Sequence, residues 1–194
     1  KLLVAGEGGL VATNDSTLAR LVRLGRNYGD GGGYDPELVG LNARMSEFHA
    51  ALALEGWGVL EDKVRRHNQI AAHYDRLLHG REGLTLQQVR RGDRSSYKDY
   101  SVLVDPAVFE GGRDLVANRL LECGIETKRY FYPPLHQQKI FRRYFEAERD
   151  KLAVTERISS RVLSLPIYAA LADEVVERIA EAIARLGTAT AVAG

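Results

Sequence analysis

Apolar residues recur at the three- and four-residue steps of a helix in five stretches, which begin near residues 16, 45, 113, 150 and 172. The first stretch follows Asn14, Asp15 and Ser16, three residue types that favour the N-cap position of a helix. The second runs to residue 79 without a proline, and as a single helix it would be about 50 Å long. Gly56 and Gly58 lie near its middle, where glycine can kink or break a helix. The pattern therefore predicts one helix long enough to connect two subdomains.

Alternation of apolar and polar residues predicts strands in other parts of the chain. Residues 99–104 and 125–131 alternate in this way, and they flank the helix predicted over 113–123. Residues 10–13 form a short apolar run that predicts a third strand, whereas 84–94 is polar and irregular. The strand–helix–strand unit is typical of a small α/β domain.

Two further segments are expected to lack regular structure. Residues 27–41 are rich in glycine and polar side chains, which predicts an irregular loop, and long loops of this kind are often functional. Residues 187–194 are predicted to form a frayed tail after the last helix.

Charge and cysteine content exclude several classes of protein. The 27 Lys and Arg residues nearly balance the 26 Asp and Glu residues, so the net charge of +1 gives no reason to expect nucleic acid or a charged membrane as partner. The longest apolar run falls short of the roughly 18 residues of a transmembrane helix. The single Cys123 excludes an internal disulfide framework, and we expect it to be a core thiol. His67, His73 and His79 recur every six residues, which is a poor spacing for the ligands of one metal ion. We therefore expect these histidines to lie on the surface, and we expect no metal site. We also expect the protein to be cytoplasmic.

Three sequence motifs carry the candidate chemistry. The first is Lys1 followed by the Gly-Glu-Gly-Gly segment at 6–9, the second is the segment 40–51, and the third is the segment 124–136 with Leu-Ser-Leu-Pro at 163–166. A lysine amine can bond covalently to an aldehyde cofactor. Glycine turns let the backbone approach a cofactor closely, and an asparagine amide donates hydrogen bonds to phosphate without adding charge.

In this order and spacing, the motifs resemble the sugar aminotransferases of the DegT/DnrJ/EryC1/StrS family. The resemblance implies a pyridoxal-phosphate (PLP) enzyme of the α/β aspartate-aminotransferase fold, PLP fold type I. Members place the Schiff-base lysine just before a Gly-Glu-Gly-Gly turn, which Lys1 matches, and a Gly-x-Asn-x-Arg-Met segment about forty residues later. Asn42 and Arg44 occupy the asparagine and arginine positions of that segment. The chain departs from the family at Tyr28, where histidine is usual, and at His49, where glutamine is usual.

The resemblance covers essentially the whole chain and about the C-terminal half of a typical member. It implies that residues 1–44 complete the large cofactor domain, that 45–80 form a long connecting helix, and that 81–194 form a small α/β domain. The family's cofactor-stacking aromatic residue, its pyridine-nitrogen aspartate and most of its phosphate-binding residues would lie upstream of the lysine.

Each candidate site residue also has a purely structural interpretation. Lys1 is the expected catalytic and cofactor-binding residue, although a lysine at a chain end is most often solvated. Asn42 is expected to bind the cofactor phosphate; it could also cap the long helix, with or without that role. Arg44 binds substrate or pairs with a nearby carboxylate. Tyr132 and His136 lie in a proline-containing segment, either at the edge of a substrate site or simply exposed.

The resemblance implies transfer of an amino group from an amino acid, commonly glutamate, to the keto carbon of a nucleotide-linked deoxysugar. The resemblance further implies a homodimer with shared active sites, in which Asn42 reaches the partner's cofactor. A sugar dehydratase of the same family is an alternative, but such relatives carry histidine in place of the lysine. A non-catalytic regulatory relative is the third possibility.

Overall fold

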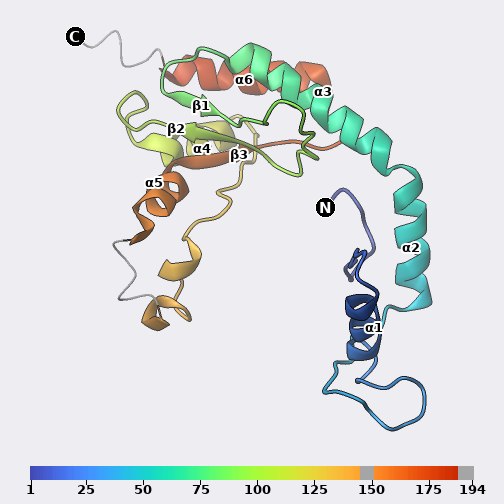
Figure 1. The fold of residues 1–194 in the computed structure, drawn as a ribbon. Helices are drawn as coiled ribbons and strands as arrows, with labels where there is room; N and C mark the ends of the chain where they lie inside the picture. The colour runs from blue at the N-terminus through green and yellow to red at the C-terminus, as the bar shows by residue number, and fades with distance from the viewer. Residues whose placement is uncertain (145–150, 188–194) are drawn as a thin grey trace. The chain divides into compact units, whose positions relative to one another are not determined.

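The computed structural model describes residues 1–144 and 151–187. The chain divides into two compact units, Lys1–Glu61 and Asp62–Gly194, and Figure 1 traces both of them from blue to red. The predicted tail at 188–194 and the predicted start of the fourth helix at 150 lie outside the described residues.

The first unit contains the helices α1 (Ser16–Gly25) and α2 (Glu47–Gly58). The predicted cap of α1 is confirmed, because an Asp15 carboxylate oxygen accepts the backbone N–H groups of Thr17 and Leu18 at 2.8 and 3.1 Å. The strand predicted at 10–13 is wrong, because these residues are exposed and pair with no strand among the described residues. A β-branched run needs a partner strand to complete its hydrogen bonds.

The predicted long helix is two helices. α2 ends at Gly58, and α3 (Leu60–Leu78) begins after Val59, whose backbone has left helical geometry at φ −108° and ψ 2°. The break falls beside one of the two glycines that predicted it. Ser46 caps α2, since its hydroxyl accepts the backbone N–H of His49. The alternative role of Asn42 as the helix cap is therefore wrong.

A three-stranded antiparallel sheet lies at the centre of the second unit, in the order β1 (Leu84–Leu86), β2 (Tyr100–Val104) and β3 (Val162–Leu165). The predicted strand at 99–104 is confirmed as β2. The segment 125–131, predicted as a strand, forms one bridge, between Lys128 and Ser164. The segment 84–94 is predicted to be irregular, but its first three residues form β1, because the side chains at 84 and 86 pack against the core.

Helices cover the sheet. α4 (Gly112–Glu122) and α5 (Ala153–Arg161) pack against it, and α3 and α6 (Asp173–Gly187) run side by side over it (Figure 1). The short 3₁₀ helices η1 (Leu135–Gln137) and η2 (Arg142–Tyr144) follow α4 in the chain. Arg66 links α3 to the start of α6, because it donates to the Leu171 carbonyl at 2.6 Å and to the Asp173 carboxylate at 2.7 Å.

Stacked tyrosines anchor α3 to the sheet. The rings of Tyr74 and Tyr100 lie 4.8 Å apart, and Tyr100 donates its hydroxyl to Asp75 at 2.6 Å. Burial raises the pKa of both phenols well above the ordinary value.

Two predicted side-chain positions are wrong. His67 is buried, with Nδ1 2.8 Å from the Tyr97 carbonyl oxygen, so its predicted surface position is wrong. The predicted core position of Cys123 is wrong too, because α4 ends there and leaves the thiol exposed.

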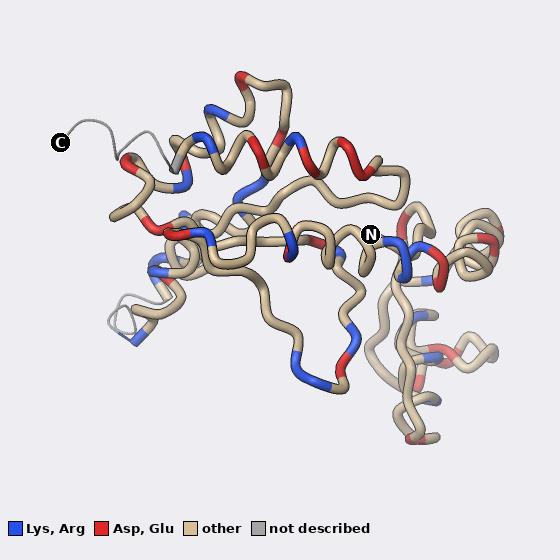
Figure 2. Tube along the Cα trace, turned by 90° about the horizontal axis from the view of Figure 1, so that it is seen from above, with Lys and Arg blue, Asp and Glu red and all other residues tan. Residues whose placement is uncertain are grey.

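Lys and Arg are interspersed with Asp and Glu along the chain (Figure 2), in keeping with the net charge of +1. Among residues 1–144 and 151–187, no helix combines the length and apolar character that a membrane span requires. The same residues hold no cluster of three or more histidine, cysteine or carboxylate side chains suited to a metal ion.

Candidate functional site

The glycine segment after Lys1 packs directly against the second motif. Gly6 and Gly8 have positive φ angles of 68° and 149°. A Cβ atom on Gly6 would lie 2.7 Å from Cδ2 of His49, and one on Gly8 would lie 2.5 Å from Cε of Met45. The positive φ angles favour glycine at both positions, and a Cβ there would force the His49 or Met45 side chain to move. The first two motifs, separated by about forty residues in the chain, meet in one unit.

Asn42 sits on a short antiparallel bridge with Asn27 at the end of α1. The bridge is flanked by two backbone hydrogen bonds, from Tyr28 to the Leu41 carbonyl at 3.0 Å and from Ala43 to the Arg26 carbonyl at 2.9 Å. The Asn42 side chain is exposed, and it has no hydrogen-bond partner among the described residues. The backbone of Asn42 is thus fixed while its amide is available to a ligand.

The glycine-rich loop between these partners is more ordered than its composition predicts. The Asp30 carboxylate accepts the backbone N–H groups of Gly32, Gly33 and Tyr34 at 2.7, 2.9 and 3.2 Å. These hydrogen bonds, with that of Gly32 the strongest, hold the pKa of Asp30 below its usual value. Arg20 of α1 forms an ion pair with Glu37 on the far side of the loop. Hydrogen bonds and an ion pair thus hold the loop that connects α1 to Asn42.

Replacing Gly29 by alanine is expected to lower the free energy of unfolding of the complete protein by about 2 kcal/mol or more. Gly29 has φ +80°, and a Cβ there would lie 1.7 Å from the Leu38 carbonyl oxygen. Gly33→Ala is the matched control, because a Cβ on Gly33 meets nothing within 4 Å. Denaturant unfolding of both variants gives the comparison, and equal losses from the two would contradict the close approach at Gly29.

Among the described residues, Arg44 interacts with an aromatic side chain and with no carboxylate. Its guanidinium carbon lies 5.1 Å from the centre of the Tyr28 ring, and one terminal nitrogen donates to the Tyr28 hydroxyl at 3.2 Å. The predicted structural alternative, an ion pair of Arg44 with a nearby carboxylate, is therefore wrong. Tyr28 has φ +62°, an unusual angle for a tyrosine. This residue is one of the two departures from the family pattern.

The second unit holds the remaining predicted site residues, Tyr132 and His136. His136 is 7% exposed, and its Nε2 lies 3.0 Å from a carboxylate oxygen of Glu156 on α5. The same oxygen accepts the side-chain amide of Gln137 at 2.9 Å. The exposed position expected for His136 is therefore wrong, because η1 turns its ring onto α5. Tyr132 remains half exposed, and the guanidinium carbon of Arg113 lies 4.3 Å from its ring centre.

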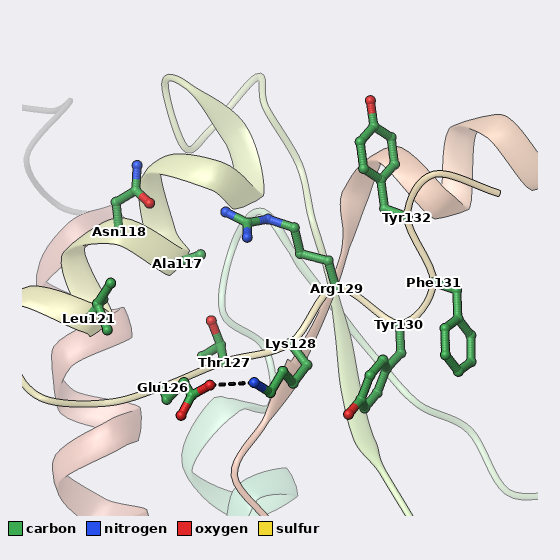
Figure 3. A pocket seen from close by; sticks show the side chains of 10 residues that line it. All are labelled: Ala117, Asn118, Leu121, Glu126, Thr127, Lys128, Arg129, Tyr130, Phe131 and Tyr132. Atoms are coloured by element: carbon green, nitrogen blue, oxygen red, sulfur yellow. Dashed lines mark hydrogen bonds and ion pairs between the residues drawn. The ribbon is translucent and has the colours of Figure 1, made fainter. Parts of the chain in front are cut away.

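A pocket of about 600 Å³ lies beside Tyr132, between α4 and the segment 126–132. Figure 3 shows the Arg129 side chain extending toward Asn118 of α4, with the aromatic side chains of residues 130–132 on the opposite side. Asp114 accepts a hydrogen bond from Nε of Arg129 at 2.6 Å. Partial desolvation raises the pKa of Asp114, but the hydrogen bonds and charges of Arg129 and Arg113 outweigh it and leave the pKa lowered.

Several residues of this region were not predicted as functional. Arg113 and Asp114 open a helix, and Glu156 and Ser159 lie within another, where polar residues ordinarily face solvent. Apart from the contact between the neighbours Arg113 and Asp114, these residues contact partners 15 to 49 residues away in sequence. Helical periodicity carries no signal for such contacts.

Comparison with known proteins places these features in a family. The family model of the DegT/DnrJ/EryC1/StrS aminotransferases matches residues 1–184. The chain belongs to this family. Among its relatives is the Escherichia coli dTDP-4-amino-4,6-dideoxy-D-glucose transaminase, 30% identical over 89% of this chain and 46% of the relative. The Aneurinibacillus thermoaerophilus dTDP-3-amino-3,6-dideoxy-alpha-D-galactopyranose transaminase is 32% identical over 93% of this chain and 47% of the relative.

Solved structures of this aminotransferase family confirm the predicted fold class. The structure of DesI in the presence of its TDP-sugar product superposes with a TM-score of 0.85 at 30% sequence identity. That comparison covers 98% of this chain and 48% of DesI. The chain thus spans about half the length of the DegT-family proteins that it matches.

Proposed function

We propose that the complete protein is a PLP-dependent aminotransferase that moves an amino group from glutamate to the keto carbon of a nucleotide-linked deoxysugar. One observation carries the proposal: the glycine turn that follows Lys1 packs onto the segment that contains Asn42. The names of the DegT-family relatives support the substrate class, because the two relatives described above are named as transaminases of dTDP-linked aminosugars. A cytoplasmic location is part of the same proposal.

The residues of the first unit fit PLP. Lys1 is an exposed primary amine with no ion-pair or hydrogen-bond partner among the described residues, and the Asn42 amide is equally available. PLP, when bound, supplies an electron-accepting ring that makes the proton on the amino-bearing carbon removable. Lys1 would hold the aldehyde carbon through Nζ and then carry a proton on that nitrogen. Asn42 would donate its amide N–H to the phosphate.

The substrate-binding residues in the proposal are Arg44, Tyr132 and His136. Arg44 is held by Tyr28 and keeps donors for an anionic group of the substrate. His136 is oriented by Glu156, which fixes one ring nitrogen and leaves the other for the substrate. We also propose that residues 1–44 complete the cofactor domain, that 45–80 connect the domains, and that 81–194 form the small domain.

Lys1 also bears on the alternative functions. The sugar dehydratases of this family resemble the aminotransferases but replace the lysine by histidine, so Lys1 favours transamination. No specific contact among the described residues favours a regulatory role.

The apolar surface of α2 supports a homodimer with shared active sites. Phe48, Leu54 and Trp57 are 88, 74 and 63% exposed, and α2 has no buried residue. A helix that is apolar over most of its surface is ordinarily buried. We propose that a second copy of the protein covers part of α2, which begins four residues after Ala43, so that Asn42 lies near the interface and reaches the partner's cofactor.

Phe48→Glu is expected to weaken the dimer of the complete protein at least about tenfold, because it places a charge in an apolar contact. Light scattering coupled to size-exclusion chromatography, over a dilution series, measures the effect. Glu55→Lys is the control on the same helix, because it changes charge at a position that is already charged and exposed. A Phe48→Glu protein that dissociates at the same concentration as the wild type would contradict the interface.

The proposed reaction is tested with the complete enzyme, ¹⁵N-labelled glutamate and dTDP-linked keto-deoxysugars. We expect mass spectrometry to find the ¹⁵N label in an aminosugar nucleotide. Loss of a sugar hydroxyl group without gain of nitrogen would favour the dehydratase instead. Absence of both products would contradict the proposal for these substrates.

A further inference from the structure

Arg113 is a buried arginine that has no role in the reaction proposed above. Its side chain is 2% exposed at the start of α4. One terminal nitrogen donates to the Ser159 carbonyl and also lies 3.3 Å from the Val162 carbonyl oxygen. These two carbonyls belong to the junction between α5 and β3. Arg113 thus joins α4 to that junction by contacts that a lysine could reproduce only in part.

The remaining face of the same guanidinium covers a predicted substrate-binding residue. Its central carbon lies 4.3 Å from the ring centre of Tyr132, within the range of a cation–π contact. Ser159, whose carbonyl Arg113 holds, donates its own hydroxyl to the Phe131 carbonyl at 2.8 Å. One buried arginine therefore supports the Tyr132 ring directly, and the backbone before it through Ser159.

α5 fixes the other end of the same segment. Glu156 lies one helical turn before Ser159 and contacts both His136 and Gln137. The segment from 131 to 137 is therefore attached to α5 at both ends. Between these attachments, Tyr132 is half exposed, and its ring packs against the Arg113 guanidinium.

We propose that Arg113 is a positioning residue that holds the Tyr132 ring in the orientation that binds the nucleotide sugar. The proposal rests on the proposed transamination for its substrate, and it adds a residue that touches no substrate itself. The guanidinium acts through Tyr132, so its loss impairs recognition of the sugar nucleotide and leaves the chemistry at Lys1 unchanged.

Arg113→Lys in the complete enzyme is expected to raise the KM for the nucleotide sugar about tenfold and to leave kcat within about twofold. Lysine keeps the positive charge but lacks the planar face and the fork of donors. The KM for glutamate is expected to stay unchanged. Arg119→Lys is the matched control on the same helix, because Arg119 is exposed and pairs with Glu122, and it is expected to change neither constant.

A double-mutant comparison separates positioning from general destabilisation. Tyr132→Leu leaves Arg113 intact and is expected to raise the same KM by a similar factor. The double variant is expected to be no worse than either single one, because both changes remove the same contact. Multiplicative effects on KM, or an unchanged KM in Arg113→Lys, would overturn the proposal.

Limited trypsin digestion tests the positioning without any assay of activity. Arg113→Lys is expected to speed cleavage after Lys128 and Arg129 severalfold, while cleavage after Arg119 within α4 keeps its wild-type rate. Equal acceleration at all three positions would show general unfolding and overturn the local role. A wild-type enzyme that makes no aminosugar would contradict the proposed function, but it would leave this digestion result standing.

Discussion

Replacing Lys1 by alanine is expected to abolish amino transfer by the complete enzyme, with a loss of at least about a thousandfold in kcat. General acid–base catalysis alone accounts for about 10²–10⁴ in rate, and the same lysine is proposed to hold the cofactor covalently. The loss is measured as the rate of ¹⁵N transfer from labelled glutamate to the sugar nucleotide, under single-turnover conditions with cofactor added in excess.

Lys63→Ala provides the control for the removal of a lysine. Lys63 lies on α3 in none of the three motifs, and its replacement is expected to leave the rate within about twofold. Folding of the Lys1→Ala protein is checked by its unfolding midpoint without cofactor, which should match that of the cofactor-free wild type because the Lys1 side chain is exposed. A Lys1→Ala enzyme with more than about a tenth of wild-type activity would contradict the catalytic role.

The second large effect is expected from mixing two inactive proteins. Lys1→Ala removes the amine, and Asn42→Asp replaces an amide donor by a carboxylate that repels the cofactor phosphate. If Asn42 serves the partner's site, exchange of subunits produces heterodimers in which one site has both an intact lysine and an intact asparagine. Random exchange should then restore about a quarter of wild-type activity, from two inactive parents.

The matched control is a mixture of Lys1→Ala with the double variant Lys1→Ala, Asn42→Asp, which can form no intact lysine site. That mixture should stay inactive. If Asn42 instead serves its own subunit, every site in the first mixture keeps one defect, and activity stays at the level of the parents. A monomeric mass for the active enzyme would also contradict the shared site.

The elements with strong local signals could be predicted from the sequence. Asp15 caps α1 and β2 alternates as its residues predict, because both features depend on neighbouring positions. The apolar run at 10–13 and the alternation at 125–131 also predict strands, but a strand depends on a distant partner as well. The sequence of one segment carries no information on whether such a partner lies beside it.

The candidate site shows the same limit. Lys1 and Asn42 were found through motif spacing, and the contact between their two segments came from the structure. The two prolines before His136 predict an exposed side chain. The structure buries it instead, against Glu156, which lies twenty residues away in sequence. Arg113 gave no signal, because an arginine in the first turn of a helix is ordinarily solvated.

The most direct measurement of the central claim is the position of the cofactor on the polypeptide. The complete enzyme is incubated with PLP, reduced with borohydride to make the bond permanent, digested and mapped by peptide mass spectrometry. We expect the pyridoxyl group on Lys1, and we expect its yield to fall when glutamate is added before reduction, because the amino donor releases the lysine. Labelling of Lys63 or Lys128 with Lys1 unmodified would contradict the assignment, and with it the proposed aminotransferase mechanism.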